Sequence, residues 1–113
     1  MSDKVKKVEV IKKAEYPKGT TSTGISCNGG YLGRTIIAIT STHQTNGDAT
    51  ESQVVMLRCG YDGNHLTETV IAETRGAGLS RLVSFGTDSN GNITVICNAN
   101  PGVQILFISN KEF

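Results

Sequence analysis

Few residues in this 113-residue chain are of a type that could do chemistry. The histidines, His43 and His65, each lie beside a polar turn sequence, and no GxSxG-type motif supplies a serine that either could activate. The cysteines, Cys27, Cys59 and Cys97, lack the CxxC or Cys/His spacing that binds zinc. We therefore expect no catalytic residues, no metal and no cofactor, and we interpret each cysteine as a small buried hydrophobic residue.

One group of residues near a turn has the chemistry of a sugar-binding site: Tyr61, Asp62, Asn64 and His65. An amphipathic tyrosine ring can stack on the apolar face of a pyranose, and the three polar side chains can hydrogen-bond to its hydroxyl groups. The alternative is that the segment forms the tip of a hairpin, because Asp-Gly is a typical hairpin-turn dipeptide. The sequence is compatible with both interpretations.

Composition excludes several classes of partner. Eleven Lys and Arg residues against ten Asp and Glu give a net charge of +1, so no overall field attracts nucleic acid or anionic lipid. No apolar run approaches the roughly 20 residues needed to cross a bilayer, and the lysine-rich start differs from a signal peptide. We expect synthesis and folding in a reducing cytoplasm, with no nucleic-acid or membrane partner.

The first part of the chain differs from the rest in charge. Residues 1–15 have an apolar pattern that fits a helix or a strand, and the Tyr16-Pro17-Lys18-Gly19 sequence then interrupts any helix. We therefore predict a charged N-terminal arm over residues 1–18 and a compact domain over residues 19–113. The arm is either a solvated terminus or an attachment segment that docks on a neighbouring protein through Lys4, Lys6, Lys7, Lys12 and Lys13.

After residue 20, strand and turn signals alternate. Thirteen glycines, two prolines and many Thr, Ser, Asn and Val residues are typical of a turn-rich β protein. The short connections favour an antiparallel β-sandwich of the jelly-roll type, or a barrel. We predict strands at 35–41, 53–59, 66–73, 81–86, 92–98 and 103–109, with turns at 61–64, 88–91 and 99–102 and polar loops at 43–52 and 75–78.

The segment VQILFIS, residues 103–109, is apolar on both faces of a strand. Val103, Ile105 and Phe107 would point to one side, and Leu106 and Ile108 to the other. The segments TIIAITS and QVVMLRC are also apolar on both faces. In a monomeric sandwich, the outer face of each sheet is usually polar and exposed to solvent. This indicates an interior strand and an interface between copies of the chain. The alternatives are that a loop or the arm covers the second face, or that these are central strands of a tightly curled barrel.

Three segments together resemble the small β-sandwich head domains of bacteriophage tail-fibre, receptor-binding and head-decoration proteins. These segments are GGYLGRTIIAITS, GTDSNGNITVICN and VQILFIS, within Tyr31 to Ser109. The resemblance implies a homotrimer that binds other virion proteins through its arm, presents loops outward, and meets a host surface glycan. It therefore implies a non-enzymatic virion structural protein that is made in the host cytoplasm. A free-standing carbohydrate-binding lectin is the alternative.

Overall fold

The computed structural model describes residues 8–43, 51–60, 62, 65–74 and 82–110. Within these ranges every regular element is a β-strand, as the Thr- and Val-rich composition predicts. The described residues contain no helix with the length and apolar character to cross a bilayer. The prediction of an all-β antiparallel fold is confirmed.

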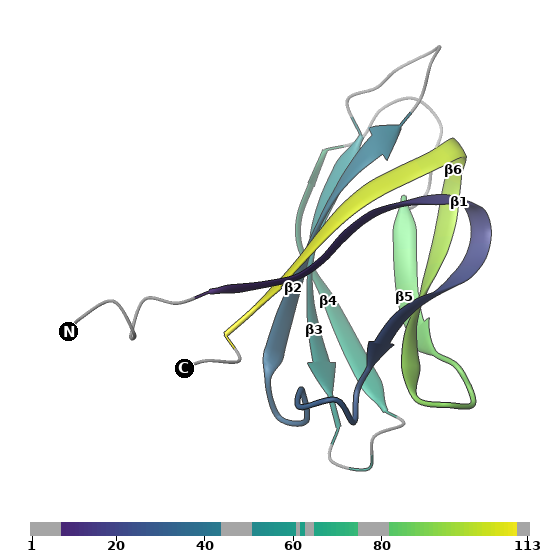
Figure 1. Ribbon diagram of the computed structural model, residues 1–113. Helices are drawn as coiled ribbons and strands as arrows, with labels where there is room; N and C mark the ends of the chain where they lie inside the picture. The colour runs from purple at the N-terminus through teal and green to yellow at the C-terminus, as the bar shows by residue number, and fades with distance from the viewer. Residues whose placement is uncertain (1–7, 44–50, 61, 63–64, 75–81, 111–113) are drawn as a thin grey trace.

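Six strands form one antiparallel sheet (Figure 1). The strand order is β1-β6-β2-β3-β4, and β5 also pairs with β6. The last strand of the chain is therefore an interior strand, as the sequence of residues 103–109 predicts. The strands are β1 (Glu9–Ser26), β2 (Thr35–His43), β3 (Ser52–Cys59), β4 (Leu66–Thr74), β5 (Val83–Thr87) and β6 (Asn92–Ser109).

The two longest strands, β1 and β6, take part in two layers. Residues 9–17 of β1 pair with residues 102–109 of β6, which also pair with β2. Residues 19–22 of β1 pair with residues 94–97 of β6, and β5 pairs with the same part of β6. Figure 1 shows both strands bending between these halves. The large layer thus contains β2, β3, β4, residues 9–17 of β1 and residues 102–109 of β6. The small layer contains β5, residues 19–22 of β1 and residues 94–97 of β6.

The core lies between the two layers. Val103, Ile105 and Phe107 of β6 are fully buried, and alternate residues of this strand point the other way. The Phe107 ring packs edge-on against Tyr16 of β1 and Phe85 of β5, with ring centroids 6.5 and 6.0 Å apart. Because Phe85 belongs to the small layer, its contact with Phe107 shows that the layers face each other, an arrangement compatible with the predicted sandwich.

The bend in β6 lies at Asn100-Pro101-Gly102, where the sequence predicts a reversing turn. The prediction of a turn that separates two strands is wrong, because residues 92–109 form one strand, which bends sharply in Figure 1. Both halves stay paired with β1, and Pro17 lies opposite Gly102. Pro and Gly also occur at bends within strands, so this sequence pattern could not distinguish the two outcomes.

The predicted turn between β5 and β6 is present. The Gly91 N–H donates to the Asp88 carbonyl oxygen at 3.0 Å, and Gly91 has a φ of 78°, which favours glycine. The Asp88 Oδ1 accepts hydrogen bonds from the N–H groups of Asn90 and Asn92, at 2.9 and 3.0 Å. The backbone hydrogen bond from Asn92 is the largest factor that lowers the pKa of the Asp88 carboxyl group.

The structured part of the chain starts earlier than residue 19. Residues 9–18, which we assigned to the arm, are in β1, and pairing with β6 begins at Glu9 opposite Ser109. The predicted boundary therefore falls inside a strand. The Val8 and Val10 alternation, which left strand and helix open, belongs to an extended segment, and the interruption at Pro17 marks the bend in β1.

Candidate self-association surface

The outer surface of the large layer carries an apolar row that crosses four strands. Ile108 of β6 lies opposite Val10 of β1 on one side and opposite Ile37 of β2 on the other. Ile37 in turn lies opposite Met56 of β3. Directly opposed residues in an antiparallel sheet point to the same face, so these side chains form a continuous row. Val10 is 60% exposed, although it is apolar.

A second apolar row runs beside the first. Leu106 of β6 lies opposite Ile39 of β2, and Ile39 lies opposite Val54 of β3. The row ends at Ala72 of β4. The large apolar residues of the two rows, together with Val8, which lines a hollow with Ile37 and Ile108, form a surface that we call the outer apolar face. Its members are Val8, Val10, Ile37, Ile39, Val54, Met56, Leu106 and Ile108, all half-buried or exposed.

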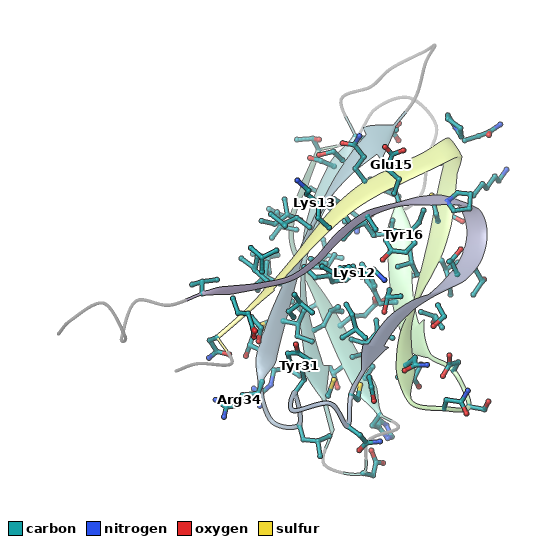
Figure 2. All side chains as sticks on the ribbon, viewed as in Figure 1. Lys12, Lys13, Glu15, Tyr16, Tyr31 and Arg34 are labelled. Carbon is teal, nitrogen blue, oxygen red and sulfur yellow. The ribbon has the colours of Figure 1, made fainter. Side chains whose placement is uncertain are left out.

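Polar groups flank the outer apolar face. Lys13 lies opposite Leu106, and Glu15 lies opposite Gln104. Figure 2 shows Lys13 and Glu15 directed away from the interior, toward which Tyr16 points. An open hollow of about 530 Å³ lies here, and Ile39 and Leu106 also line it. The surface thus has an apolar centre beside a charged margin.

A second hollow, of about 340 Å³, lies at the other end of the same surface. Val8, Ile37 and Ile108 supply its apolar wall, and Thr35 and Asn110 supply polar groups. The Asn110 Oδ1 accepts a hydrogen bond of 3.4 Å from the Thr35 N–H, which ties the end of β6 to the start of β2. Both ends of the outer apolar face are therefore hollowed rather than flat.

The outer surface of the small layer is different. Ile96 is 38% exposed, close to the 39% of Ile39. Its opposed neighbours are Thr20 of β1 and Ser84 of β5, so it is an isolated apolar side chain among polar ones. Single exposed apolar residues are ordinary in soluble proteins, whereas a contiguous group is not. The apolar excess predicted from three strand sequences therefore lies on one surface.

The sequence indicated most of this surface, because TIIAITS, QVVMLRC and VQILFIS supply six of its eight members. It did not indicate Val8 and Val10, which we placed in a separate arm. The signal that could have found them is the alternation of Val8 and Val10 with charged residues, typical of a half-buried strand.

The candidate sugar site is described in part. Tyr61 and Asn64 lie outside the described residues. Asp62 and His65 do lie together: the Asp62 Oδ1 accepts the His65 N–H at 3.0 Å, and Oδ2 lies 3.5 Å from the His65 Nδ1. The His65 carbonyl oxygen accepts the Gly60 N–H at 2.8 Å. These bonds close the connection between β3 and β4.

The structure describes two of the five predicted attachment lysines, and they have different surroundings. Lys4, Lys6 and Lys7 lie outside the described residues. Lys13 flanks the outer apolar face, and Lys12 reaches across the bend of β1, where its Nζ donates to the Thr23 carbonyl oxygen at 2.6 Å. Figure 2 shows Lys12 between the two halves of β1. Lys12 thus stabilises the bend in β1.

Among the described residues, no group of three or more His, Cys, Asp or Glu side chains is placed to hold a metal ion. Burial raises the pKa of the Tyr16 phenol, and among the described residues its hydroxyl group has no hydrogen-bond partner. Burial is also the main cause of the raised pKa of the Cys97 thiol. These groups lie in the core, so we assign them no chemistry with a substrate.

No protein-family model matches the chain, and no curated protein is significantly similar to it. Among solved structures, the tailspike protein of Acinetobacter phage vB_ApiP_P1 aligns with 92% of this chain, at 14% sequence identity and a TM-score of 0.49. The chain spans 21% of the length of that tailspike protein. Similarity at this level assigns neither a family nor an activity.

Proposed function

We propose that this protein is a non-enzymatic structural component of a virus particle, and that it assembles with copies of itself through the outer apolar face. The observation that carries the proposal is the continuity of the two apolar rows, the first across β1, β6, β2 and β3 and the second across β6, β2 and β3 to Ala72 of β4. The largest contiguous apolar patch on a protein surface is often functional, and an apolar patch with a polar rim is typical of interaction sites.

The size of the outer apolar face fits this role. Neighbouring strands lie about 4.8 Å apart and residues about 3.3 Å apart, so two rows across four strands, each row two residues wide, cover roughly 250 Å². A stable interface buries about 800 Å² on each partner, with an apolar centre and a polar rim. The face supplies such a centre, and Lys13, Glu15 and Gln104 supply part of a rim.

The place of the protein in a virion is supported by the sequence resemblance to phage head domains. On that basis the assembly is a homotrimer, the protein is made in the host cytoplasm, and residues before β1 attach it to other virion proteins. Lys4, Lys6 and Lys7 are the basic residues available for this attachment, because Lys12 and Lys13 belong to β1. The loops at 43–51, 61–65 and 75–78 would face outward and meet a host surface glycan.

Two matched variants test the self-association. Ile39→Lys places a charge in the outer apolar face, and Ile96→Lys places the same charge at an equally exposed strand position on the small layer. We expect sedimentation equilibrium to give a trimer for the natural protein and for Ile96→Lys, and a monomer for Ile39→Lys. Circular dichroism should show the same β spectrum for all three.

A monomeric natural protein at high micromolar concentration would refute the self-association. Attachment is tested separately by co-sedimentation with virus particles. The deletion should remove residues 1–7 alone, because a deletion to residue 15 would remove much of β1. Loss of co-sedimentation with an intact trimer supports the virion role. Binding to glycans on an array, without binding to particles, would instead favour the lectin alternative.

A further inference from the structure

Two of the three cysteines lie at the same end of the fold. Cys27 directly follows β1, and Cys59 is the last residue of β3. The chain after Cys27 returns to β3, where Leu32 forms a bridge with Cys59 and the Gly33 N–H donates to the Cys59 carbonyl oxygen at 3.2 Å. The Cys27 N–H donates to the Gly91 carbonyl oxygen at 3.0 Å. Backbone hydrogen bonds thus hold both cysteines in place.

The two thiols interact with each other inside the core. Cys27 is 0% and Cys59 is 3% exposed, and both belong to the same cluster of buried side chains. Burial raises the pKa of the Cys59 thiol to about 12. A hydrogen bond to the Cys27 side chain and electrostatic repulsion from the Cys27 thiolate raise it further. All three cysteines are free thiols.

Cys97 has different surroundings. Its Sγ donates to the Ala99 carbonyl oxygen at 3.4 Å, and it lies opposite Gly19 in the small layer. The groups that affect its pKa are the Ala99 carbonyl group and Lys18, besides burial, and neither of the other cysteines is among them. Cys97 is as buried as the other two cysteines, and its Sγ hydrogen-bonds to a backbone carbonyl oxygen, which makes it a matched control.

We propose that Cys27 and Cys59 form an intramolecular disulfide bond when the protein meets a low-molecular-weight disulfide such as oxidised glutathione. In the first step, one deprotonated cysteine attacks oxidised glutathione, which forms a mixed disulfide and releases one glutathione thiolate. In the second step, the other cysteine attacks the protein sulfur of the mixed disulfide and releases the second glutathione.

The reaction balances. The two protein sulfurs lose two electrons and two protons, and two reduced glutathione molecules carry them away. Because buried thiols with a raised pKa react slowly, exchange requires local opening of this end of the fold or alkaline pH. The native fold favours the product, since it already holds the two sulfurs together at a high effective concentration.

The bond would join the end of β1, in the small layer, to the end of β3, in the large layer. It would close a loop that the unfolded chain otherwise leaves open, so it should stabilise the fold. A virion protein made in a reducing cytoplasm meets an oxidising medium after release. That biological setting rests on the proposed function, whereas the disulfide itself does not.

The test equilibrates the full-length protein with reduced and oxidised glutathione at pH 8.5, in buffer and in 8 M urea. After acid quenching and alkylation, mass spectrometry measures the fraction that carries the disulfide between Cys27 and Cys59. We expect at least a tenfold larger equilibrium constant for disulfide formation in buffer than in urea. We also expect a higher Tm for the oxidised protein than for the reduced protein.

Cys97→Ser should behave like the natural protein, and Cys27→Ser and Cys59→Ser should form no intramolecular disulfide in buffer. An equal or smaller equilibrium constant in buffer than in urea would overturn the proposal, because it would mean that the native geometry opposes the bond. A disulfide that includes Cys97 in the native protein, or a lower Tm after oxidation, would overturn it as well. Circular dichroism of each serine variant establishes that it is folded before exchange begins.

Discussion

The Glu68 side chain in β4 accepts a hydrogen bond from the backbone N–H of Phe85 in β5, with Oε2 2.8 Å from the nitrogen. Nearby, the Gln53 Oε1 in β3 accepts the N–H groups of Leu82 and Val83, at 2.7 and 3.0 Å. β5 pairs along one edge with β6. On the other edge, two side chains take the place of a neighbouring strand and join the small layer to β3 and β4.

We expect Gln53→Ala to destabilise the protein by about 2 to 4 kcal/mol. The substitution leaves two buried N–H groups, those of Leu82 and Val83, without their acceptor, and each such group costs about 1 to 3 kcal/mol. Urea unfolding followed by circular dichroism measures the change. Glu68→Ala should cost less, because it removes one acceptor, and Glu68→Gln should stay near the natural protein because an oxygen remains. A Gln53→Ala protein as stable as the natural one would contradict this role.

Gly102 is the residue at which the bend tolerates least change. A Cβ at this position would overlap the Tyr16 carbonyl oxygen and would lie 3.2 Å from the Cα of Pro17. Because backbone atoms supply this contact, relief requires movement of β1 against β6. We expect Gly102→Ala to cost roughly 3 kcal/mol, in the range of overpacked cores. Gly86→Ala is the matched control, since its Cβ would meet the Thr94 hydroxyl at 3.4 Å. Thermal unfolding should separate the two variants, and equal Tm values would refute the argument.

The sequence predicts strands well where apolar residues alternate and turn residues follow. It predicts the turn at 88–91, because Asp88 and Gly91 each meet a specific backbone requirement. It fails at Pro101 and Gly102, because a turn and a bend use the same residues, and pairing with distant β1 decides between them. The outer apolar face was visible as an excess of apolar residues, but its continuity depends on register across strands, which local patterns do not encode.

Removal of the Tyr16 hydroxyl group should not destabilise the protein, unlike the substitutions at Gln53 and Gly102. Tyr16 is 5% exposed, its ring packs against Phe107, and among the described residues its hydroxyl group has no hydrogen-bond partner. A buried polar group without a partner is unfavourable, so Tyr16→Phe should leave the protein unchanged or stabilise it by about 1 kcal/mol. Tyr16→Ala should destabilise it by about 3 to 5 kcal/mol through loss of packing. Guanidinium unfolding measures both, and a clear loss for Tyr16→Phe would show that the hydroxyl group is satisfied in solution.

The Asp88 turn predicts a specific dependence of stability on pH. The pKa of Asp88 is lower in the folded protein than the 3.8 of a free side chain, mainly because its carboxylate accepts the Asn92 N–H. Between the two pKa values the unfolded chain binds more protons than the folded one. The stabilisation is therefore fully present above about pH 5, declines as the pH falls through the unfolded pKa, and is lost below the folded pKa.

Asp88→Asn keeps an oxygen acceptor but removes the charge. We expect the natural protein to be more stable than Asp88→Asn at pH 7 and the difference to shrink at pH 3, as measured by urea unfolding at both values. A difference that is the same at both pH values would mean that the charge of Asp88 does not stabilise the turn.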